Sequence, residues 1–204
     1  MAVNGSGLVA ILRGVTPDEV LAVGEALVEA GVDAIEVPLN SPDPFASVER
    51  LATSLGERCA VGVGTVVDAA DVPRARAAGA RIVVAPNADP AVITAAVEAG
   101  MRPYPGVATP TEAFAAVAAG ARHLKLFPAD AVGIAGMKAW RAVLPPDVEL
   151  LPVGGVDETN LAGWAAAGAG GAGLGTALYR PGDTPGQVGA RAVAMRRAWA
   201  GATG

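Results

Sequence analysis

The chain has 204 residues, of which 52% are hydrophobic and 17% are charged, and its formal net charge is −5 at pH 7. This composition excludes an intrinsically disordered chain. The acidic balance, with no basic run, argues against nucleic acid or an anionic membrane as a partner.

Eight short apolar runs alternate along the chain with alanine-rich stretches that are typical of helices. The runs predicted as strands cover residues 8–13, 34–39, 60–65, 81–86, 101–106, 123–128, 149–154 and 171–176. Two of the predicted helices carry capping-box signals with proline at the first helical position, TPDE at Thr16 and TPTE at Thr109. Glycines suited to helix C-caps lie at Gly31, Gly79, Gly100 and Gly120.

The segment 161–179 has no charged residue over 19 positions and could be mistaken for a membrane span. Its six glycines and many alanines argue against that interpretation. A spanning helix needs a sustained run of large apolar side chains. We predict instead a helix, a glycine turn and a short strand.

The cellular setting is predicted from two features. Cys59 is the single cysteine, so an intrachain disulfide is excluded and a reducing cytoplasm is favoured. The N-terminal segment lacks a positive region followed by a long apolar core, so no signal peptide is expected.

The regular alternation predicts an α/β fold, namely a (β/α)8 TIM barrel formed by one compact domain over residues 1–204. An open doubly wound sheet uses the same alternation and is the alternative. In a barrel, the catalytic groups lie at the C-terminal ends of the strands.

Strand periodicity predicts which side chains meet at that end of the barrel. Alternate residues point to opposite faces of a strand. Lys125 and Glu36 are each flanked by apolar residues expected to face the helices, and Arg13 alternates with the outward-facing Ala10 and Leu12, so all three point inward. Thr65 ends its strand with the parity of Val61 and Val63, and we expect it at the same barrel mouth.

Lys125 and Glu36 allow two interpretations. They could form a buried structural ion pair, which is the commoner outcome for single residues and contributes little to stability. Alternatively, burial lowers the pKa of Lys125, and its neutral amine forms a Schiff base with a carbonyl while Glu36 acts as general acid and base. The pattern alone leaves both open.

Glycine-rich segments end the last two predicted strands, PVGGV at 152–156 and GLGTALY at 173–179. In barrels this is a frequent phosphate site, because glycine lets backbone N–H groups approach the anion and a following helix N-terminus favours negative charge. Simple tight turns are the alternative.

Motifs over nearly the whole chain are similar to those of one enzyme family. They are AILRGVTPDE (10–19), EVPLNSP (36–42), GVGTV (62–66), APN (85–87), PGVATPTEAF (105–114), LKLFPA (124–129), VGGV (153–156) and GLGTALYR (173–180). In this order they resemble the class I aldolases that cleave 2-dehydro-3-deoxy-6-phospho sugar acids, the KDPG/KHG aldolase family.

The resemblance implies a role for each candidate residue. Lys125 would form the Schiff base and Glu36 would shuttle protons, while Arg13 and Thr65 would hold the carboxylate of the pyruvoyl end. The remaining substrate-binding residues would be Pro86, Val153, Gly154, Gly155, Gly175 and Thr176, with the last four receiving the phosphate.

The resemblance also implies the products, pyruvate and D-glyceraldehyde 3-phosphate, and a homotrimer. No metal or cofactor is expected, since the iminium is the electron sink. No cluster with metal-ligand spacing accompanies His123, the single histidine, which we expect to be a non-catalytic pocket or structural residue.

Two positions bear on the choice of substrate. The gluconate-specific relatives usually have Thr where this chain has Val153 and tend to have Arg where it has Asn40. These differences favour the galactonate epimer over the gluconate epimer or 4-hydroxy-2-oxoglutarate. A non-covalent isomerase of phosphorylated sugars and a non-catalytic phosphate-ligand barrel remain alternatives from other classes.

Overall fold

The computed structural model describes residues 7–203, in which parallel strands alternate with helices. The strands are β1 (Leu8–Ile11), β2 (Ala34–Pro38), β3 (Ala60–Gly64), β4 (Ile82–Val84), β5 (Arg102–Tyr104), β6 (Gly106–Val107), β7 (His123–Leu126), β8 (Glu149–Pro152) and β9 (Ala172–Leu174). The helices are α1 (Val20–Glu29), α2 (Pro44–Leu55), a 3-10 turn η1 (Ala69–Asp71), α3 (Val72–Ala77), α4 (Pro90–Glu98), α5 (Pro110–Ala118), α6 (Ala129–Arg141), α7 (Leu161–Ala166) and α8 (Pro185–Thr203). The predicted α/β class is therefore confirmed.

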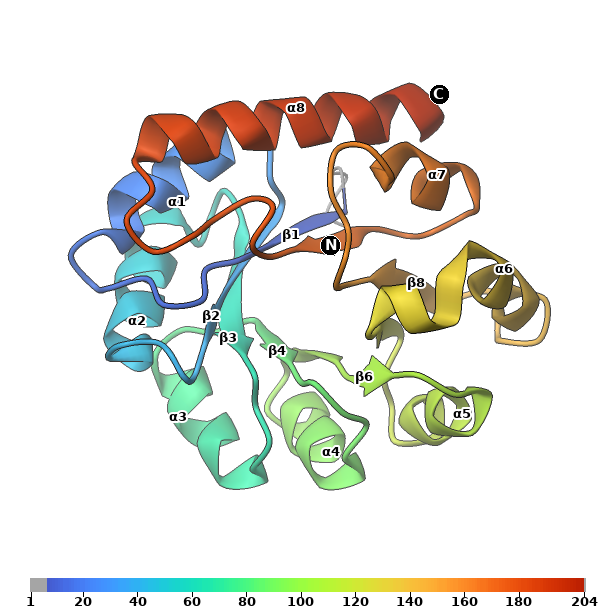
Figure 1. Cartoon of the computed structure of the whole chain (residues 1–204). Helices are drawn as coiled ribbons and strands as arrows, with labels where there is room; N and C mark the ends of the chain where they lie inside the picture. The colour runs from blue at the N-terminus through green and yellow to red at the C-terminus, as the bar shows by residue number, and fades with distance from the viewer. Residues whose placement is uncertain (1–6, 204) are drawn as a thin grey trace.

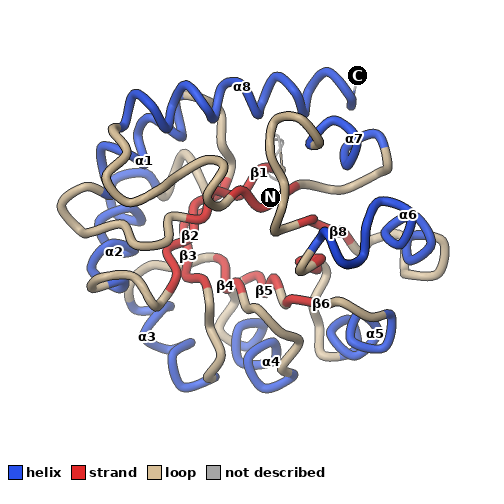
Figure 2. Tube along the Cα trace, viewed as in Figure 1, coloured by secondary structure: helices blue, strands red, loops and turns tan. Residues whose placement is uncertain are grey.

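The strands form two parallel sheets that curl around a central region, with the helices on the outside (Figures 1 and 2). The larger sheet has the order β5-β4-β3-β2-β1-β9 and the smaller has the order β6-β7-β8. An isolated parallel bridge between Val153 and Gly173 connects β8 to β9. The doubly wound alternative does not fit, because such a sheet has helices on both faces, whereas here the helices lie only on the outside of the curl.

The fifth predicted strand, 101–106, differs from the structure. It is divided into β5, which pairs with β4, and β6, which pairs with β7. Pro105 lies between them and has no N–H to donate to a ladder, so the pairing is interrupted at this position. Its carbonyl still accepts the N–H of Lys125 at 2.9 Å.

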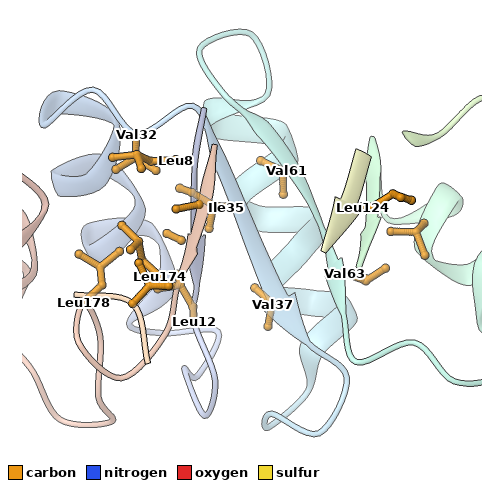
Figure 3. Packing of buried hydrophobic residues seen from close by; sticks show 14 of the residues in the cluster. Leu8, Leu12, Val32, Ile35, Val37, Val61, Val63, Leu124, Leu174 and Leu178 are labelled. Carbon is orange, nitrogen blue, oxygen red and sulfur yellow. The ribbon is translucent and has the colours of Figure 1, made fainter. Parts of the chain in front are cut away.

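Alternation along the strands separates two apolar clusters. The outer cluster fills the space between sheet and helices and includes the labelled side chains of Figure 3, such as Ile35, Val63 and Leu124. The inner cluster lies inside the curl and consists of Val9, Ala34, Ala60, Ile82, Val84, Tyr104 and Leu151. The inner cluster thus surrounds the inward-facing Glu36 and Lys125 with apolar side chains.

The uncharged segment 161–179 has the predicted structure. It contains α7, a turn at Gly168 with φ of 89°, and β9. Among the described residues, no helix is long and apolar enough to cross a membrane.

The helix ends follow the predicted signals with one exception. All four predicted C-cap glycines have positive φ, as a left-handed cap requires. At Thr109 the capping box is complete, since its hydroxyl accepts the N–H of Glu112 and Glu112 accepts the N–H of Thr109. At Thr16 the box is not formed. Glu19 accepts the N–H and the hydroxyl of Thr16, but its own N–H donates to the carbonyl of Thr16 and not to the hydroxyl, and the helix begins at Val20.

The two threonines give a matched test of this difference. Replacing Thr109 with alanine leaves the N–H of Glu112 without its side-chain acceptor, so we expect the free energy of unfolding to fall by about 1 kcal/mol. Thr16→Ala removes no such acceptor and should cost clearly less. Urea unfolding of both variants measures the difference, and equal losses would contradict it.

Candidate active site

One cavity of about 590 Å³ opens at the C-terminal ends of the strands. It is the place where a parallel α/β fold of this kind carries its chemistry. Nine of the ten residues predicted for the site line it, namely Arg13, Thr65, Pro86, Lys125, Val153, Gly154, Gly155, Gly175 and Thr176. The tenth, Glu36, lies deeper.

Lys125 projects from β7 into the cavity. Its neighbours Leu124 and Leu126 are fully buried in the outer cluster, which directs the lysine to the inner face. The side chain is 7% exposed, and Nζ lies 4.5 Å from the centroid of the Phe127 ring. It makes no hydrogen bond or ion pair with a described residue.

Glu36 lies beneath Lys125, in an adjoining cavity of about 20 Å³ that both residues line. It is 1% exposed, and its Oε2 has no hydrogen-bond partner among the described residues. Gly64 on β3 makes room for the carboxylate, because a Cβ at this position would lie only 1.8 Å from Oε2. Strand β3 thus presents Val61 and Val63 to the outer cluster and Gly64 to Glu36.

Burial shifts the pKa of both groups towards neutrality. Desolvation raises the pKa of Glu36 to about 7, while Lys125 and Arg13 oppose the shift. Desolvation also lowers the pKa of Lys125, with Glu36 opposing and Arg13 adding to the shift. A neutral amine therefore becomes accessible at Lys125, and Glu36 can both give and take a proton near neutral pH.

The contacts of Lys125 and Glu36 do not support the interpretation that they form a structural ion pair. Within the described part of the chain, Lys125 and Glu36 form no ion pair, although each influences the pKa of the other. A carboxylate kept in this position for stability would be expected to have its partner within reach. The geometry favours the chemical interpretation.

Arg13 follows β1 at the cavity rim and is held by two polar side chains. Its Nη1 donates to Oδ1 of Asn40 at 2.6 Å, and its Nη2 donates to Oγ1 of Thr65 at 3.3 Å. The guanidinium is thereby fixed near Lys125, where it can receive a carboxylate.

Thr65 reaches the cavity by a route that strand parity does not predict. Val61 and Val63 of the same parity lie in the outer cluster. Thr65 comes after the end of β3 and has a φ of 57°, which is uncommon for a residue other than glycine. This backbone reversal brings its hydroxyl to the cavity.

The two glycine segments lie side by side at the cavity. Gly154 and Gly155 have φ of 91° and 70°, and a Cβ on Gly155 would lie 2.1 Å from the carboxylate of Asp130. Residues 175–179 form one helical turn, in which the N–H of Tyr179 donates to the carbonyl of Gly175 at 3.0 Å. The backbone N–H groups of Gly155, Thr176 and Ala177 have no acceptor among the described residues.

The predicted helix N-termini do not follow these segments directly. The six-residue helix α7 begins at Leu161 and α8 begins at Pro185. In the second segment, the single turn starting at Gly175 takes the place of the helix, and its first N–H groups face the cavity without partners. An anion can still be received by backbone donors.

His123 lies at the opposite end of β7 from the cavity. Its ring packs on Tyr104 with 4.8 Å between centroids, and its Nε2 lies 3.6 Å from Oε2 of Glu149. Burial lowers its pKa. His123 does not line the large cavity, so its contacts are those of a structural residue. In the described part of the chain, no three His, Cys, Asp or Glu side chains are grouped as metal ligands.

The contacts of three residues near the site were not predicted from the sequence. Gly64 makes room for Glu36, and only the cross-strand register of β2 and β3 shows this. Asn40 had been noted only as a difference from relatives, yet it holds Arg13. Arg180 lines the cavity beside Thr176 and carried no signal beyond its place in the GLGTALYR motif.

Comparison with known proteins agrees with this geometry. The family model "KDPG and KHG aldolase" matches residues 2–183. The chain is 51% identical over 192 residues to the "Probable 2-dehydro-3-deoxy-6-phosphogalactonate aldolase" of Rhizobium meliloti (strain 1021), covering 94% of this chain and 91% of that protein. It is 45% identical to the 2-dehydro-3-deoxy-6-phosphogalactonate aldolase of Escherichia coli (strain K12), with 94% of each chain covered.

A solved structure described as "Native KDPGal structure" shares the fold over almost its full length. Its TM-score is 0.94 at 45% identity, and the match covers 96% of this chain and 95% of that one. Family model, sequence relatives and solved structure thus agree over nearly the whole chain, and the chain belongs to the KDPG and KHG aldolase family.

Proposed function

We propose that this aldolase cleaves 2-dehydro-3-deoxy-6-phosphogalactonate into pyruvate and D-glyceraldehyde 3-phosphate through a Schiff base on Lys125. The observation that carries the proposal is a buried lysine with no ion-pair partner among the described residues, which shares a small cavity with a carboxyl group whose pKa is raised to about 7. The names of the two sequence relatives support the substrate.

Lys125 and Glu36 divide the chemistry between them. The neutral amine of Lys125 adds to the C2 carbonyl, and Glu36 supplies the proton that lets water leave, so an iminium forms. Glu36 then accepts the proton of the C4 hydroxyl while the C3–C4 bond breaks, and the electron pair moves into the iminium to give an enamine. Glyceraldehyde 3-phosphate leaves, C3 is protonated, and water releases pyruvate from the lysine.

The other lining residues orient the two ends of the substrate. Arg13 and Thr65 hold the pyruvoyl carboxylate, since the guanidinium is already fixed beside Lys125. Pro86 shapes the wall of the cavity. Gly154, Gly155, Gly175 and Thr176 receive the phosphate, supported by the backbone N–H groups of these segments that have no acceptor among the described residues.

Val153 is the residue we assign to the choice between epimers. It is 8% exposed and lines both cavities, next to the phosphate segments. The galactonate and gluconate substrates differ at C4, whose hydroxyl loses its proton during cleavage. A valine offers this region shape without a hydrogen bond, whereas the threonine usual in gluconate enzymes adds one.

The architecture and assembly complete the proposal. We infer a closed (β/α)8 barrel in one domain, supported by the bridge from Val153 to Gly173 and by the hydrogen bond from Lys125 to Pro105 across the two sheets. A homotrimer rests on the family resemblance alone. Catalysis without a metal and a cytoplasmic setting stay predictions.

Trapping with borohydride tests the covalent step. With pyruvate present, one reduced pyruvoyl group should appear on the peptide that contains Lys125, because only this amine is desolvated. The chain has one other lysine, the exposed Lys138, which serves as the matched control. Lys125→Arg should abolish cleavage, since a guanidinium stays protonated, and Lys138→Arg should leave it intact. An isomerase or a ligand sensor predicts no adduct.

Glu36→Gln tests the proton shuttle. Loss of a general acid and base should lower kcat by roughly 10²–10⁴-fold while some pyruvate trapping survives. The limb of the pH–rate profile near pH 7 should also disappear. Turnover close to wild type would make Glu36 a structural residue.

Stability supplies the control for the Glu36 variant. Because burial raises the pKa of Glu36 from 4.5 to about 7, the wild type loses stability as pH rises through that range. Glu36→Gln lacks this loss and should be at least as stable as the wild type above pH 7. Thermal unfolding of both proteins as a function of pH measures the difference in stability. If the variant is less stable than the wild type above pH 7, its lost activity is explained by misfolding.

Val153→Thr tests the epimer assignment. The wild type should prefer the galactonate epimer, and the variant should raise the gluconate-to-galactonate ratio of kcat/KM by roughly ten- to a hundred-fold, the effect of one hydrogen bond in a tight site. Val67→Thr is the matched control, since Val67 is 59% exposed and lies outside the cavity. An unchanged ratio would show that Val153 does not distinguish the two configurations at C4.

A further inference from the structure

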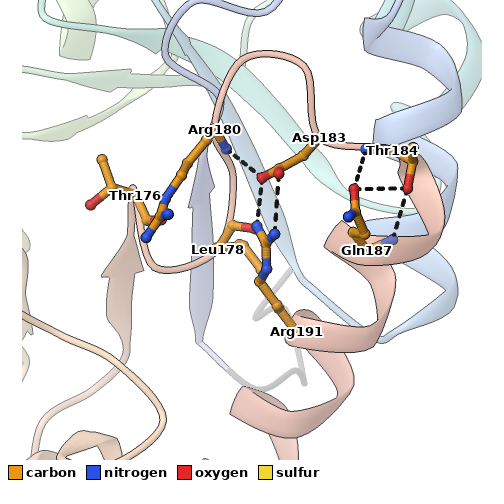
Figure 4. A network of polar contacts seen from close by, with 7 residues as sticks. All are labelled: Thr176, Leu178, Arg180, Asp183, Thr184, Gln187 and Arg191. Carbon is orange, nitrogen blue, oxygen red and sulfur yellow. Dashed lines mark hydrogen bonds and ion pairs between the residues drawn. The ribbon is translucent and has the colours of Figure 1, made fainter.

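Arg180 lies on the cavity rim, beside the glycine segments and after the helical turn of residues 175–179. Its Nε donates to the carbonyl of Thr176 at 3.1 Å, so the side chain turns back towards that turn (Figure 4). This is the single hydrogen bond of its guanidinium within the described residues, and it forms no ion pair there. The two terminal nitrogens are therefore free to donate to a ligand.

The cavity has three cationic lining residues, and two of them already have a part in the proposed reaction. Lys125 forms the Schiff base, and Arg13 is held by Asn40 and Thr65 at the pyruvoyl end. Arg180 is the third, and it lies next to Thr176, which the proposed reaction assigns to the phosphate. A substrate with two anionic groups would therefore have one guanidinium available for each.

The loop that carries Arg180 is held in place by hydrogen bonds with Asp183 and Arg191. Asp183 accepts the backbone N–H of Arg180 at 2.8 Å, and Arg191 of α8 donates to both carboxylate oxygens of Asp183 (Figure 4). Arg191 also donates to the carbonyl of Leu178 at 3.0 Å. These bonds from Arg191 hold the pKa of Asp183 below its usual range. The hydrogen bonds of Asp183 and Arg191 connect the backbone of Arg180 to α8. The side chain of Arg180 points away from Asp183 (Figure 4).

Apart from Arg180, the groups near the proposed phosphate position offer a bound anion no positive charge. The backbone N–H groups of Gly155, Thr176 and Ala177 are neutral donors. The one carboxylate that lines the cavity, Asp157, is occupied by the N–H and hydroxyl of Thr159, and these bonds lower its pKa so that it stays ionised. A phosphate bound here without Arg180 would add its charge to that of Asp157.

We propose that Arg180 binds the phosphate group of the substrate, with its terminal nitrogens donating to phosphate oxygens while the backbone of the glycine segments supplies the neutral hydrogen bonds. Asp183 and Arg191 act as positioning residues for this arginine. The inference rests on the proposed function and adds to it the charged partner of the phosphate.

Binding of glycerol 3-phosphate tests this proposal without any turnover. Calorimetry on the full chain should give an affinity that falls about ten- to a hundred-fold in Arg180→Gln, the effect of losing a charge-assisted hydrogen-bonding pair. Arg180→Lys keeps the charge without the planar fork and should lie between the two. The matched control is Arg58→Gln, which removes an exposed arginine just before β3, at the opposite ends of the strands.

Kinetics then separate a phosphate contact from general damage. In Arg180→Gln, kcat/KM should fall by a similar factor for the phosphorylated sugar acid and by less than about twofold for its dephosphorylated form, with pyruvate trapping on Lys125 unchanged. Equal affinities for glycerol 3-phosphate in the Arg180→Gln and Arg58→Gln variants, or no binding by the wild type, would overturn the proposal. Binding that depends on Arg180 together with no trapped pyruvate would overturn the proposed reaction and leave the phosphate contact standing.

Discussion

The burial of Lys125 and Glu36, which form no ion pair among residues 7–203, is the constraint on which the rest of the site depends. An ionised group taken out of water is costly unless it is paired or neutralised. Here desolvation is the largest cause of both shifts, raising the pKa of Glu36 and lowering that of Lys125. In the proposed reaction, this environment favours the neutral amine of Lys125 and lets Glu36 exchange a proton near neutral pH.

The fold maintains that environment through small residues and apolar neighbours. Gly64 leaves the space that the carboxylate of Glu36 occupies, and larger side chains on the same strand face the helices. The inner cluster below, with Tyr104 and Leu151, keeps the floor apolar. Polar groups concentrate at the rim, where they orient a ligand without relieving the desolvation underneath.

Charge is distributed so that an acidic protein can receive an acidic substrate. The chain has a net charge of −5, yet the cavity is lined by Arg13, Lys125 and Arg180 and by a single carboxylate, Asp157. A cationic concavity with low-dielectric walls focuses its field on the ligand that enters it. The placement of the two arginines on different parts of the rim suits a molecule with a carboxylate at one end and a phosphate at the other.

The sequence by itself determined the α/β class, the inward direction of Lys125, Glu36 and Arg13, and the presence of glycine-rich segments at the ends of the last two strands. These features depend on local periodicity, which a single strand or helix already shows. The tertiary structure alone decided what periodicity cannot encode. Thr65 reaches the cavity through a positive φ against its strand parity, and the break between β5 and β6 depends on which neighbours Pro105 finds.

The space beside Glu36, the anchoring of Arg13 and the placement of Arg180 were also decided only in three dimensions. Gly64 is distant from Glu36 along the chain, as Asn40 is from Arg13, and each pair meets only when the parallel strands come into register. The pKa of Glu36 has the same origin, because desolvation sums over atoms contributed by many strands. Local sequence can place a charged residue on the inner face, but only the assembled fold removes the water around it.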